Sequence, residues 1–269
     1  VEVADAFGSS VSTTTSVTVD DGPSAYLITS LMKDLIEQGQ GKLDGAEMAR
    51  LIDVGVKSGG DCSPTWMLNK LEKAWTYIGG GRGGTSKTKL DLVAGSLEQA
   101  TAAGSGLSST EATEGFELLS TLVDDSLQSG NVNTVGLLIG SMANVLPTFT
   151  SSGQSTPARV AAVDSLIGKM WSRSLESRHA LPGMDMCEFT ADGIGISAGA
   201  YATTKEGINV TSSSGSWFRF EAAEGAGESQ GEGVNAAIVT LDASLVNAPD
   251  FEDTNTSFVS EAVMVSMKG

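Results

Sequence analysis

Few side chains in this 269-residue chain have the types and spacing that catalysis requires. The only histidine is His179, which stands between Arg178 and the run Ala180-Leu181-Pro182, where we expect a helix-to-strand connection. No local pattern links this histidine to a nucleophile, and the run Ser212-Ser213-Ser214 contains no Gly-x-Ser-x-Gly turn. The residue types therefore predict a protein that is not an enzyme.

One glycine-rich segment comes within a residue of a phosphate-binding loop. Between Gly79 and Lys89 the sequence has the glycines and the Lys87-Thr88 pair of such a loop, but Ser86 stands where glycine should precede the lysine. A phosphate loop must also follow a buried strand, so that its amides converge at the next helix. The residues before Gly79 have helical periodicity instead, so we predict a surface loop.

Two acidic groups in the last third of the chain offer oxygen ligands. The first is a set of four glutamates and the second a set of three carboxylates: Glu221, Glu224, Glu228 and Glu232, then Asp250, Glu252 and Asp253. Calcium prefers such ligands, but neither set has the fixed alternation of an EF-hand loop. We predict solvated hairpin loops and no cofactor, with a calcium site at Asp250, Glu252 and Asp253 as the alternative.

The net charge excludes several classes of partner. The chain has 16 basic and 33 acidic residues, a formal charge of −17. This argues against binding to nucleic acid or an anionic membrane surface, because both need clustered lysine and arginine. Even the apolar run Val135–Leu146 is shorter than the ~18 residues that a membrane helix requires. We therefore predict no membrane insertion in this segment.

Tryptophan and asparagine residues suggest two further kinds of site. Three of the four tryptophans, Trp66, Trp75 and Trp171, fall at apolar-face spacing in expected helices, and Trp217 lies outside them. This spacing favours core packing over a sugar-binding platform. The tripeptides that begin at Asn209 and Asn255 match the N-glycosylation pattern, which is short and also occurs by chance.

From Gly22 to about residue 178 the sequence predicts seven helices. Asp44 with Glu47, and Ser108 with Glu111, form capping boxes, and Ser63 caps a helix that begins with proline. Apolar residues in the first helix follow helical spacing: Leu27, Ile28, Leu31, Leu35 and Ile36. Further helices are expected at about 86–102, 108–129, 133–146 and 156–178.

After Pro182-Gly183 the period changes from that of helices to that of short strands. Helices followed by strands, without βαβ alternation, predict an α+β fold. We expect residues 22–182 to form a helical bundle and residues 183–269 an incomplete antiparallel, sandwich-like subdomain. Residues 1–21 hold a strand pair, with Val1 and Val3 on one strand and Val17 and Val19 on the other, separated by a turn. Two strands alone are marginal in water, which favours a larger multidomain parent.

This order of parts resembles the extracellular region of the polycystin and receptor-for-egg-jelly (REJ) proteins. In that family, Ig-like repeats and an REJ module lead into a GAIN (autoproteolysis-inducing) domain. The resemblance lies in the first ten residues, the glycine-stopped helices and the acidic strands that end in 257–269. It implies that residues 1–21 end an Ig-like domain and that the rest is GAIN-like. The composition would suit an algal or protist ciliary surface protein of the mastigoneme type.

The resemblance implies an extracellular glycoprotein with a structural or cell-adhesion role, whose partners are other domains of the same protein and neighbouring subunits. The alternative is a module that binds glycan or calcium through its acidic loops. The family's His-Leu/Ile-Thr/Ser cleavage site is not matched, because His179 is followed by Ala180 and Leu181. Extracellular placement favours a disulfide between Cys62 and Cys187, the only two cysteines. Two unrelated buried thiols are the alternative.

Overall fold

The computed structural model describes most of the helical part and the strands of the β part. The described residues are 2–4, 10–12, 23–39, 42–58, 60–79, 87–102, 106–128, 132–151, 156–177, 186–202, 208–211, 217–220, 233–241 and 262–268. Within them the chain folds into seven α-helices followed by antiparallel strands, so the α+β prediction and the number of helices are confirmed.

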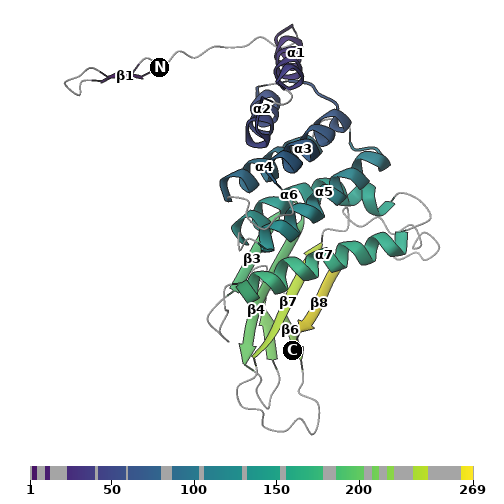
Figure 1. Cartoon of the computed structure of the whole chain (residues 1–269). Coiled ribbons are helices and arrows are strands. Elements are labelled where there is room, and N and C mark those ends of the chain that lie inside the picture. The colour runs from purple at the N-terminus through teal and green to yellow at the C-terminus, as the bar shows by residue number, and fades with distance from the viewer. Residues whose placement is uncertain are drawn as a thin grey trace.

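The helices stack one on the next from α1 to α7, and the sheet lies beyond α7 (Figure 1). Their bounds are α1 Pro23–Gln38, α2 Gly45–Lys57, α3 Pro64–Ile78, α4 Lys87–Ala102, α5 Ser109–Gln128, α6 Val132–Ser151 and α7 Thr156–Ser177. Helix α4 contacts α2 and α6 in one layer, and α5 contacts α3 and α7 in a second. The helical part predicted as a bundle is therefore a stack of two layers, in which helices contact those one and two places away along the chain.

Local capping explains where two helices begin. Asp44 accepts a 2.8 Å hydrogen bond from the Glu47 amide, and the Glu47 carboxylate accepts one of 2.9 Å from the Asp44 amide. Ser108 and Glu111 make the same reciprocal pair at the start of α5. Both predicted capping boxes are confirmed. Each satisfies backbone donors that the first turn of a helix leaves without a partner.

Helix α6 is longer than predicted, because it continues through Pro147 to Ser151. A proline inside a helix removes one backbone hydrogen bond, which is why the prediction ended at residue 146. Tertiary packing holds the last turn: the ring of Phe149 stacks on that of Phe116, with centroids 4.1 Å apart. Thr150 is buried and donates its hydroxyl to the carbonyl of Leu146 at 2.8 Å.

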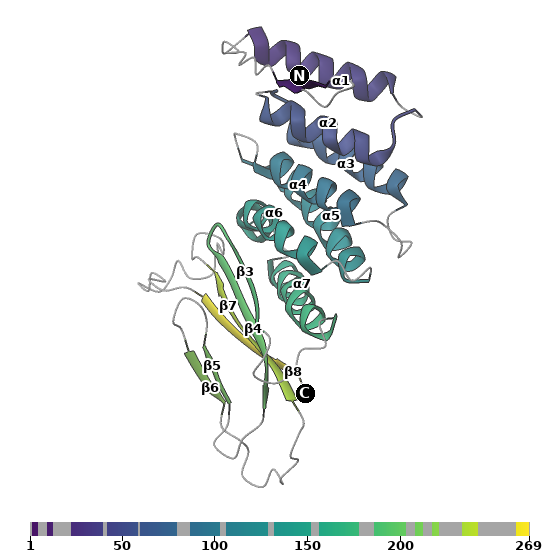
Figure 2. The same ribbon diagram turned by 90° about the vertical axis from the view of Figure 1, so that its left-hand side faces the viewer.

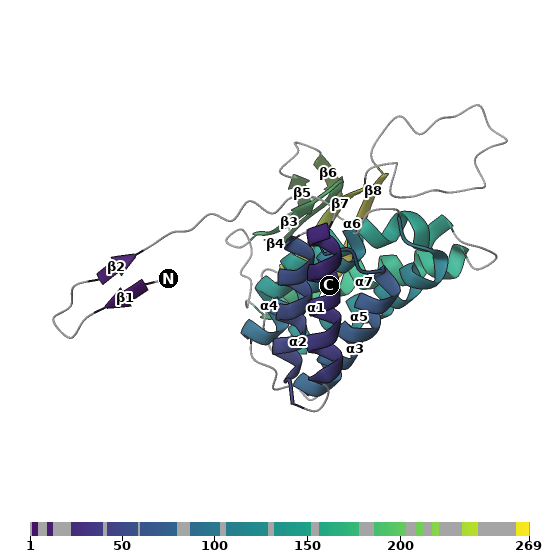
Figure 3. The same ribbon diagram turned by 90° about the horizontal axis from the view of Figure 1, so that it is seen from above.

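The main sheet has four antiparallel strands in the order β3-β4-β7-β8. Its strands are β3 Met186–Ala191, β4 Ile194–Ala202, β7 Gly233–Leu241 and β8 Ala262–Lys268. Helices α6 and α7 contact one face. A separate hairpin, β5 Ile208–Thr211 with β6 Trp217–Phe220, lies on the other side of the sheet (Figures 2 and 3). Strand β5 contacts β4 and β7 there.

Alternation along β4 and β7 decides which residues face the helices. Ile196 lies opposite Val239, and Ala198 opposite Ala237, and all four belong to the core cluster shared with the helices. Ile238, which points to the opposite face, is also fully buried. The centre of the sheet is therefore covered on both sides.

The N-terminal strands form a hairpin, but not with the predicted second strand. β1 (Glu2–Ala4) pairs with β2 (Ser10–Ser12), with Val3 opposite Val11. Residues 10–12 lie in the stretch predicted as the turn, so that part of the prediction is wrong. The alternation of Val11 between serines was too short to be distinguished from turn composition. Val17 and Val19 lie outside the described residues.

One hydrophobic core joins the helices to the sheet. The cluster of buried apolar residues runs without a break from Met32 in α1 to Leu241 in β7. Trp75 and Trp171 are both buried in it, so core packing is confirmed for these two tryptophans. None of the described helices has the combination of length and apolar character that a membrane crossing demands.

Candidate functional site

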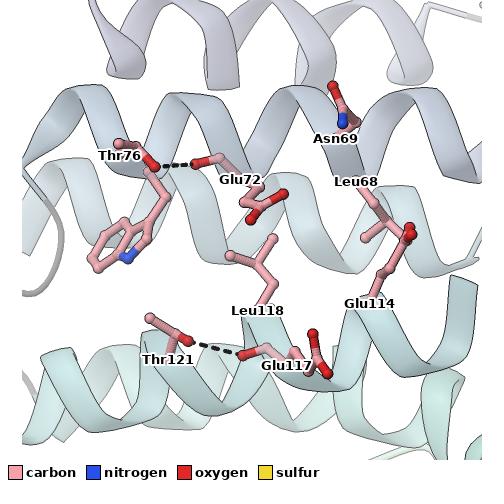
Figure 4. Close-up of a pocket in the computed structure, with 9 residues that line it drawn as sticks. Leu68, Asn69, Glu72, Thr76, Glu114, Glu117, Leu118 and Thr121 are labelled. Carbon is pink, nitrogen blue, oxygen red and sulfur yellow. Dashed lines mark hydrogen bonds between the residues drawn. The ribbon is translucent and has the colours of Figure 1, made fainter.

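A hollow of about 470 Å³ lies between α3 and α5, on the layer formed by α3, α5 and α7. Nine residues line it, and Figure 4 draws all of them: Leu68, Asn69, Glu72, Trp75, Thr76, Glu114, Glu117, Leu118 and Thr121. We call it the α3–α5 groove. Its α3 residues and its α5 residues lie at least 38 positions apart in the chain, so only the helix stack brings them together.

The groove has an apolar floor and an acidic rim. Leu68, Trp75 and Leu118 are buried and belong to the core cluster. Above them the carboxylates of Glu72 on α3 and Glu117 on α5 project into the space between the two helices (Figure 4). Glu114 on α5 and Asn69 on α3 complete the polar rim. All three glutamates of the rim are exposed.

The rim threonines are tied to their own helices. Thr76 donates its hydroxyl to the carbonyl of Glu72 at 3.0 Å, and Thr121 donates to the carbonyl of Glu117 at 2.9 Å. Among the ion pairs of the described residues, none involves a glutamate of the groove. Three carboxylates thus face a concave surface with no lysine or arginine of the described residues paired to them.

This arrangement can bind a positively charged group. An exposed carboxylate attracts a positive group, and a buried apolar floor can accept the methylene stem of a lysine or arginine side chain. The nine lining residues include no histidine, cysteine or serine. Among the described residues, no group of three or more histidine, cysteine, aspartate or glutamate side chains could hold a metal ion.

Glu111 fixes the two walls of the groove relative to each other. Besides capping α5, its carboxylate accepts hydrogen bonds from the hydroxyl of Thr65, at 2.6 Å, and from the Thr65 amide, at 3.0 Å, at the start of α3. These hydrogen bonds, first that from the Thr65 side chain and then those from Ser108, lower the pKa of Glu111 to about 2. One carboxylate therefore caps both helices that form the groove.

The two cysteines do not form the predicted disulfide. Cys62 and Cys187 are both buried as thiols. Cys62 precedes α3, whereas Cys187 lies on β3, whose main contacts are with β4, α6 and α7. The helices between them hold the two residues in different parts of the core, so this prediction is wrong. Burial raises the pKa of the Cys62 thiol, which keeps it protonated and unreactive.

Several predicted site residues lie outside the described residues. These are His179, Asn255, the four glutamates between 221 and 232, and the candidate calcium ligands Asp250, Glu252 and Asp253. Asn209 lies on β5 opposite Arg219, and its glycosylation stays a prediction. The glycine-rich segment follows helix α3 rather than a strand, but residues 80–86 lie outside the described residues, so the surface loop stays a prediction.

Sequence reasoning missed the groove residues, although one signal was present. Residues 101–150 contain no lysine or arginine, while Glu114 and Glu117 stand one helical turn apart. An acidic helix face without basic neighbours was therefore visible. A Gly-x-Ser-x-Gly match at 227–231 was also missed. It lies between strands β6 and β7, not between a strand and a helix, so its context is wrong for a catalytic serine.

Comparison of the sequence with protein-family models and with curated proteins finds no match.

Proposed function

We propose that the chain is a non-enzymatic structural or adhesion segment of a large multidomain protein at the cell or ciliary surface. Its partners would be neighbouring domains and subunits of the same assembly. The observation that carries this proposal is the single core from Met32 to Leu241. Elements that share a core cannot move independently without exposing apolar surface, so the helices and the sheet act as one rigid spacer.

The polycystin and REJ resemblance is supported by the order of the parts, and it carries the extracellular placement. A helical region followed by an antiparallel region, with Ile238 and Ala236 buried on the face of the sheet away from the helices, fits a GAIN-like domain with a sandwich. The hairpin of β1 and β2 fits the end of an Ig-like domain, because two short strands need further strands for stability.

Adhesion is tested by asking whether the chain assembles. Beads coated with the 269-residue chain should cluster, and sedimentation velocity should show a concentration-dependent shift to larger species. Beads coated with heat-denatured chain are the control. A chain that stays monomeric at every concentration and clusters no beads would contradict a structural or adhesive role.

A ligand-binding module is the second candidate, and the α3–α5 groove is the observation that favours it. The apolar floor and three glutamates would take a ligand with a positively charged, aliphatic group. A short lysine peptide should bind in calorimetry, and Glu72→Gln with Glu117→Gln should weaken binding. Asp164→Asn with Glu176→Gln on α7, two exposed residues outside the groove, is the charge-matched control. Equal weakening by the control would show unspecific attraction to an acidic protein.

The acidic loops of the β part give this second candidate a separate test. If Asp250, Glu252 and Asp253 hold calcium, the ion should raise the melting temperature by mass action, because it binds the folded state only. Replacement of all three by asparagine or glutamine should abolish the shift. An unchanged melt at millimolar calcium would remove this version of the candidate.

A further inference from the structure

The rim of the α3–α5 groove repeats one pattern of polar residues on both of its walls. Figure 4 shows these residues in the same order along the two helices: Asn69, Glu72 and Thr76 on α3, and Glu114, Glu117 and Thr121 on α5. The sequence spacing is also the same, so that successive polar groups stand one helical turn apart on each wall. The groove is therefore an elongated site, about 10 Å from its first pair of polar residues to its last at ~1.5 Å per residue.

The rim offers mainly hydrogen-bond acceptors. Its two threonines donate their hydroxyls to the carbonyls of Glu72 and Glu117, so only their oxygens remain available to a ligand. The carboxylates of Glu72 and Glu117 project from opposite walls into the space between the helices (Figure 4). A ligand that complements this rim must bring N–H donors and a positive charge.

One donor on the floor is left without a partner. Trp75 lines the groove and is 5% exposed, and its indole N–H donates to no group of the described residues. The indole nitrogen is not one of the fully enclosed polar atoms that lack a partner, so it keeps an opening, and the groove is the hollow that Trp75 lines. A buried indole N–H usually has an acceptor. The ligand should therefore bring an acceptor to the floor as well as donors to the rim.

A peptide with a basic side chain meets both demands, because its backbone carbonyls are acceptors. A polyamine has donors only, and the hydroxyls of a glycan bring no positive charge to three carboxylates. Arginine suits the two walls better than lysine. Its planar guanidinium has five N–H donors, so it can pair with Glu72 on one wall and Glu117 on the other, while its methylene stem lies on the apolar floor.

We propose that the α3–α5 groove docks an extended, arginine-bearing segment of a neighbouring protein. The guanidinium lies between Glu72 and Glu117, and a backbone carbonyl of the segment accepts from the indole N–H of Trp75. At ~3.3 Å per residue, a groove of about 10 Å takes three residues of extended chain. The net charge of −17 also favours a basic partner. This inference rests on the second candidate function, the ligand-binding module, and names its ligand.

Capped tripeptides test the choice of ligand in calorimetry with the 269-residue chain. Gly-Arg-Gly should bind about three- to tenfold more tightly than Gly-Lys-Gly, because only the guanidinium can pair with both walls at once. Gly-citrulline-Gly, which has nearly the shape of the arginine peptide but no charge, should show no measurable binding.

Glutamate variants test the position of the guanidinium. Glu72→Gln or Glu117→Gln alone should bring the affinity for the arginine peptide down to that for the lysine peptide, because one wall then lacks its charge. Asp164→Asn, at an exposed position on α7, is the charge-matched control and should keep the preference for arginine. These substitutions are all at exposed positions, so the variants should fold as the wild type does.

A tryptophan variant tests the contact with the backbone of the peptide. Trp75→Phe keeps an aromatic ring and removes the N–H, so it should weaken binding of the arginine and lysine peptides alike, by about three- to tenfold. Trp171→Phe, at a tryptophan buried outside the groove, is the matched control and should leave both affinities unchanged. Circular dichroism checks that both variants fold.

Three results would overturn the inference and leave a groove for cationic groups in place. These are equal binding of the arginine and lysine peptides, a preference for arginine that survives both glutamate variants, and an unchanged affinity in Trp75→Phe. If none of the tripeptides binds at millimolar concentration, the second candidate function is rejected as well, while the adhesion proposal keeps its own test.

Discussion

The two ends of the helical stack differ in what covers them. At one end α7 contacts α5 and α6, and it also lies against β3, β4 and β7 of the sheet. At the other end α1 packs on α2 and leaves Leu27, Leu31 and Leu35 exposed. The stack is thus covered by a sheet at the α7 end, which we call the closed end, and leaves apolar residues exposed at the α1 end, the open end.

This difference shows how a stack of helices can end. Each internal helix buries one face on the helices before it and one on those after it, so both terminal helices need a cap or a polar outer face. The sheet supplies the cap at α7. Helix α1 instead leaves Leu27, Leu31 and Leu35 exposed, and no described element covers them.

The largest expected effect comes from breaking the closed end. Trp171 in α7 is buried in the shared core. Trp171→Ala should lower the free energy of unfolding by about 3–5 kcal/mol, since it removes a large apolar side chain and leaves a cavity. Leu31→Ala at the open end should change it by less than about 0.5 kcal/mol in dilute, monomeric protein. Urea unfolding followed by circular dichroism measures both, and equal effects would contradict the contrast between the ends.

The next effect tests whether the helices near the open end are closely packed. A Cβ atom at Gly45, the first residue of α2, would lie 2.0 Å from the backbone carbonyl oxygen of Ala74 in α3. Gly45→Ala should therefore cost about 1–3 kcal/mol, because a backbone atom cannot move aside as a flexible side chain can. Gly95→Ala in α4 is the control: nothing lies within 4 Å, so it should be neutral or stabilising. A harmless Gly45→Ala would show that α2 and α3 are loosely joined.

The middle of the stack depends on Glu111, and pH should reveal it. Its folded pKa of about 2 lies below the ordinary 4.5, so its contribution is fully present above pH 4.5 and is lost as the pH falls toward 2. Glu111→Gln should lower the free energy of unfolding near neutral pH by about 0.5–2 kcal/mol, as for lost helix caps. Wild type and variant should converge as the pH falls through that window. Glu117→Gln on the same helix is the charge-matched control, and a difference that persists unchanged at pH 2 would contradict this role.

Local features of the fold were predictable from the sequence, and tertiary ones were not. The capping boxes at Asp44 and Ser108 were found because a cap and its partner lie three residues apart. The end of α6 was missed because Phe149 is held by Phe116, a residue far away in the sequence. The disulfide failed for the same reason, since spacing does not say which parts of the core two cysteines occupy.

The exposed face of α1 and the α3–α5 groove show this limit most clearly. The apolar residues of α1 were read as one stripe, because only the position of α2 divides them into buried residues and exposed leucines. The α3–α5 groove was invisible as a site, because Glu72 and Glu114 are joined only by the stacking of their helices. What lies on a helix face could be read from the sequence, but which face meets a neighbour could not.

The smallest expected effect concerns surface charge at the closed end. Lys169 in α7 lies 3.0 and 3.1 Å from the two carboxylate oxygens of Asp124 in α5, and both side chains are nearly half exposed. Exposed pairs of this kind contribute about 0–1 kcal/mol, and salt screens them. Lys169→Met keeps the aliphatic stem, so it should lower the free energy of unfolding by less than about 1 kcal/mol, and high salt should remove the difference. Asp124→Asn is the partner control and should have the same small effect. A cost that approaches that of Trp171→Ala, or one that high salt leaves unchanged, would mean that ion pairing rather than the shared core holds α7 in place.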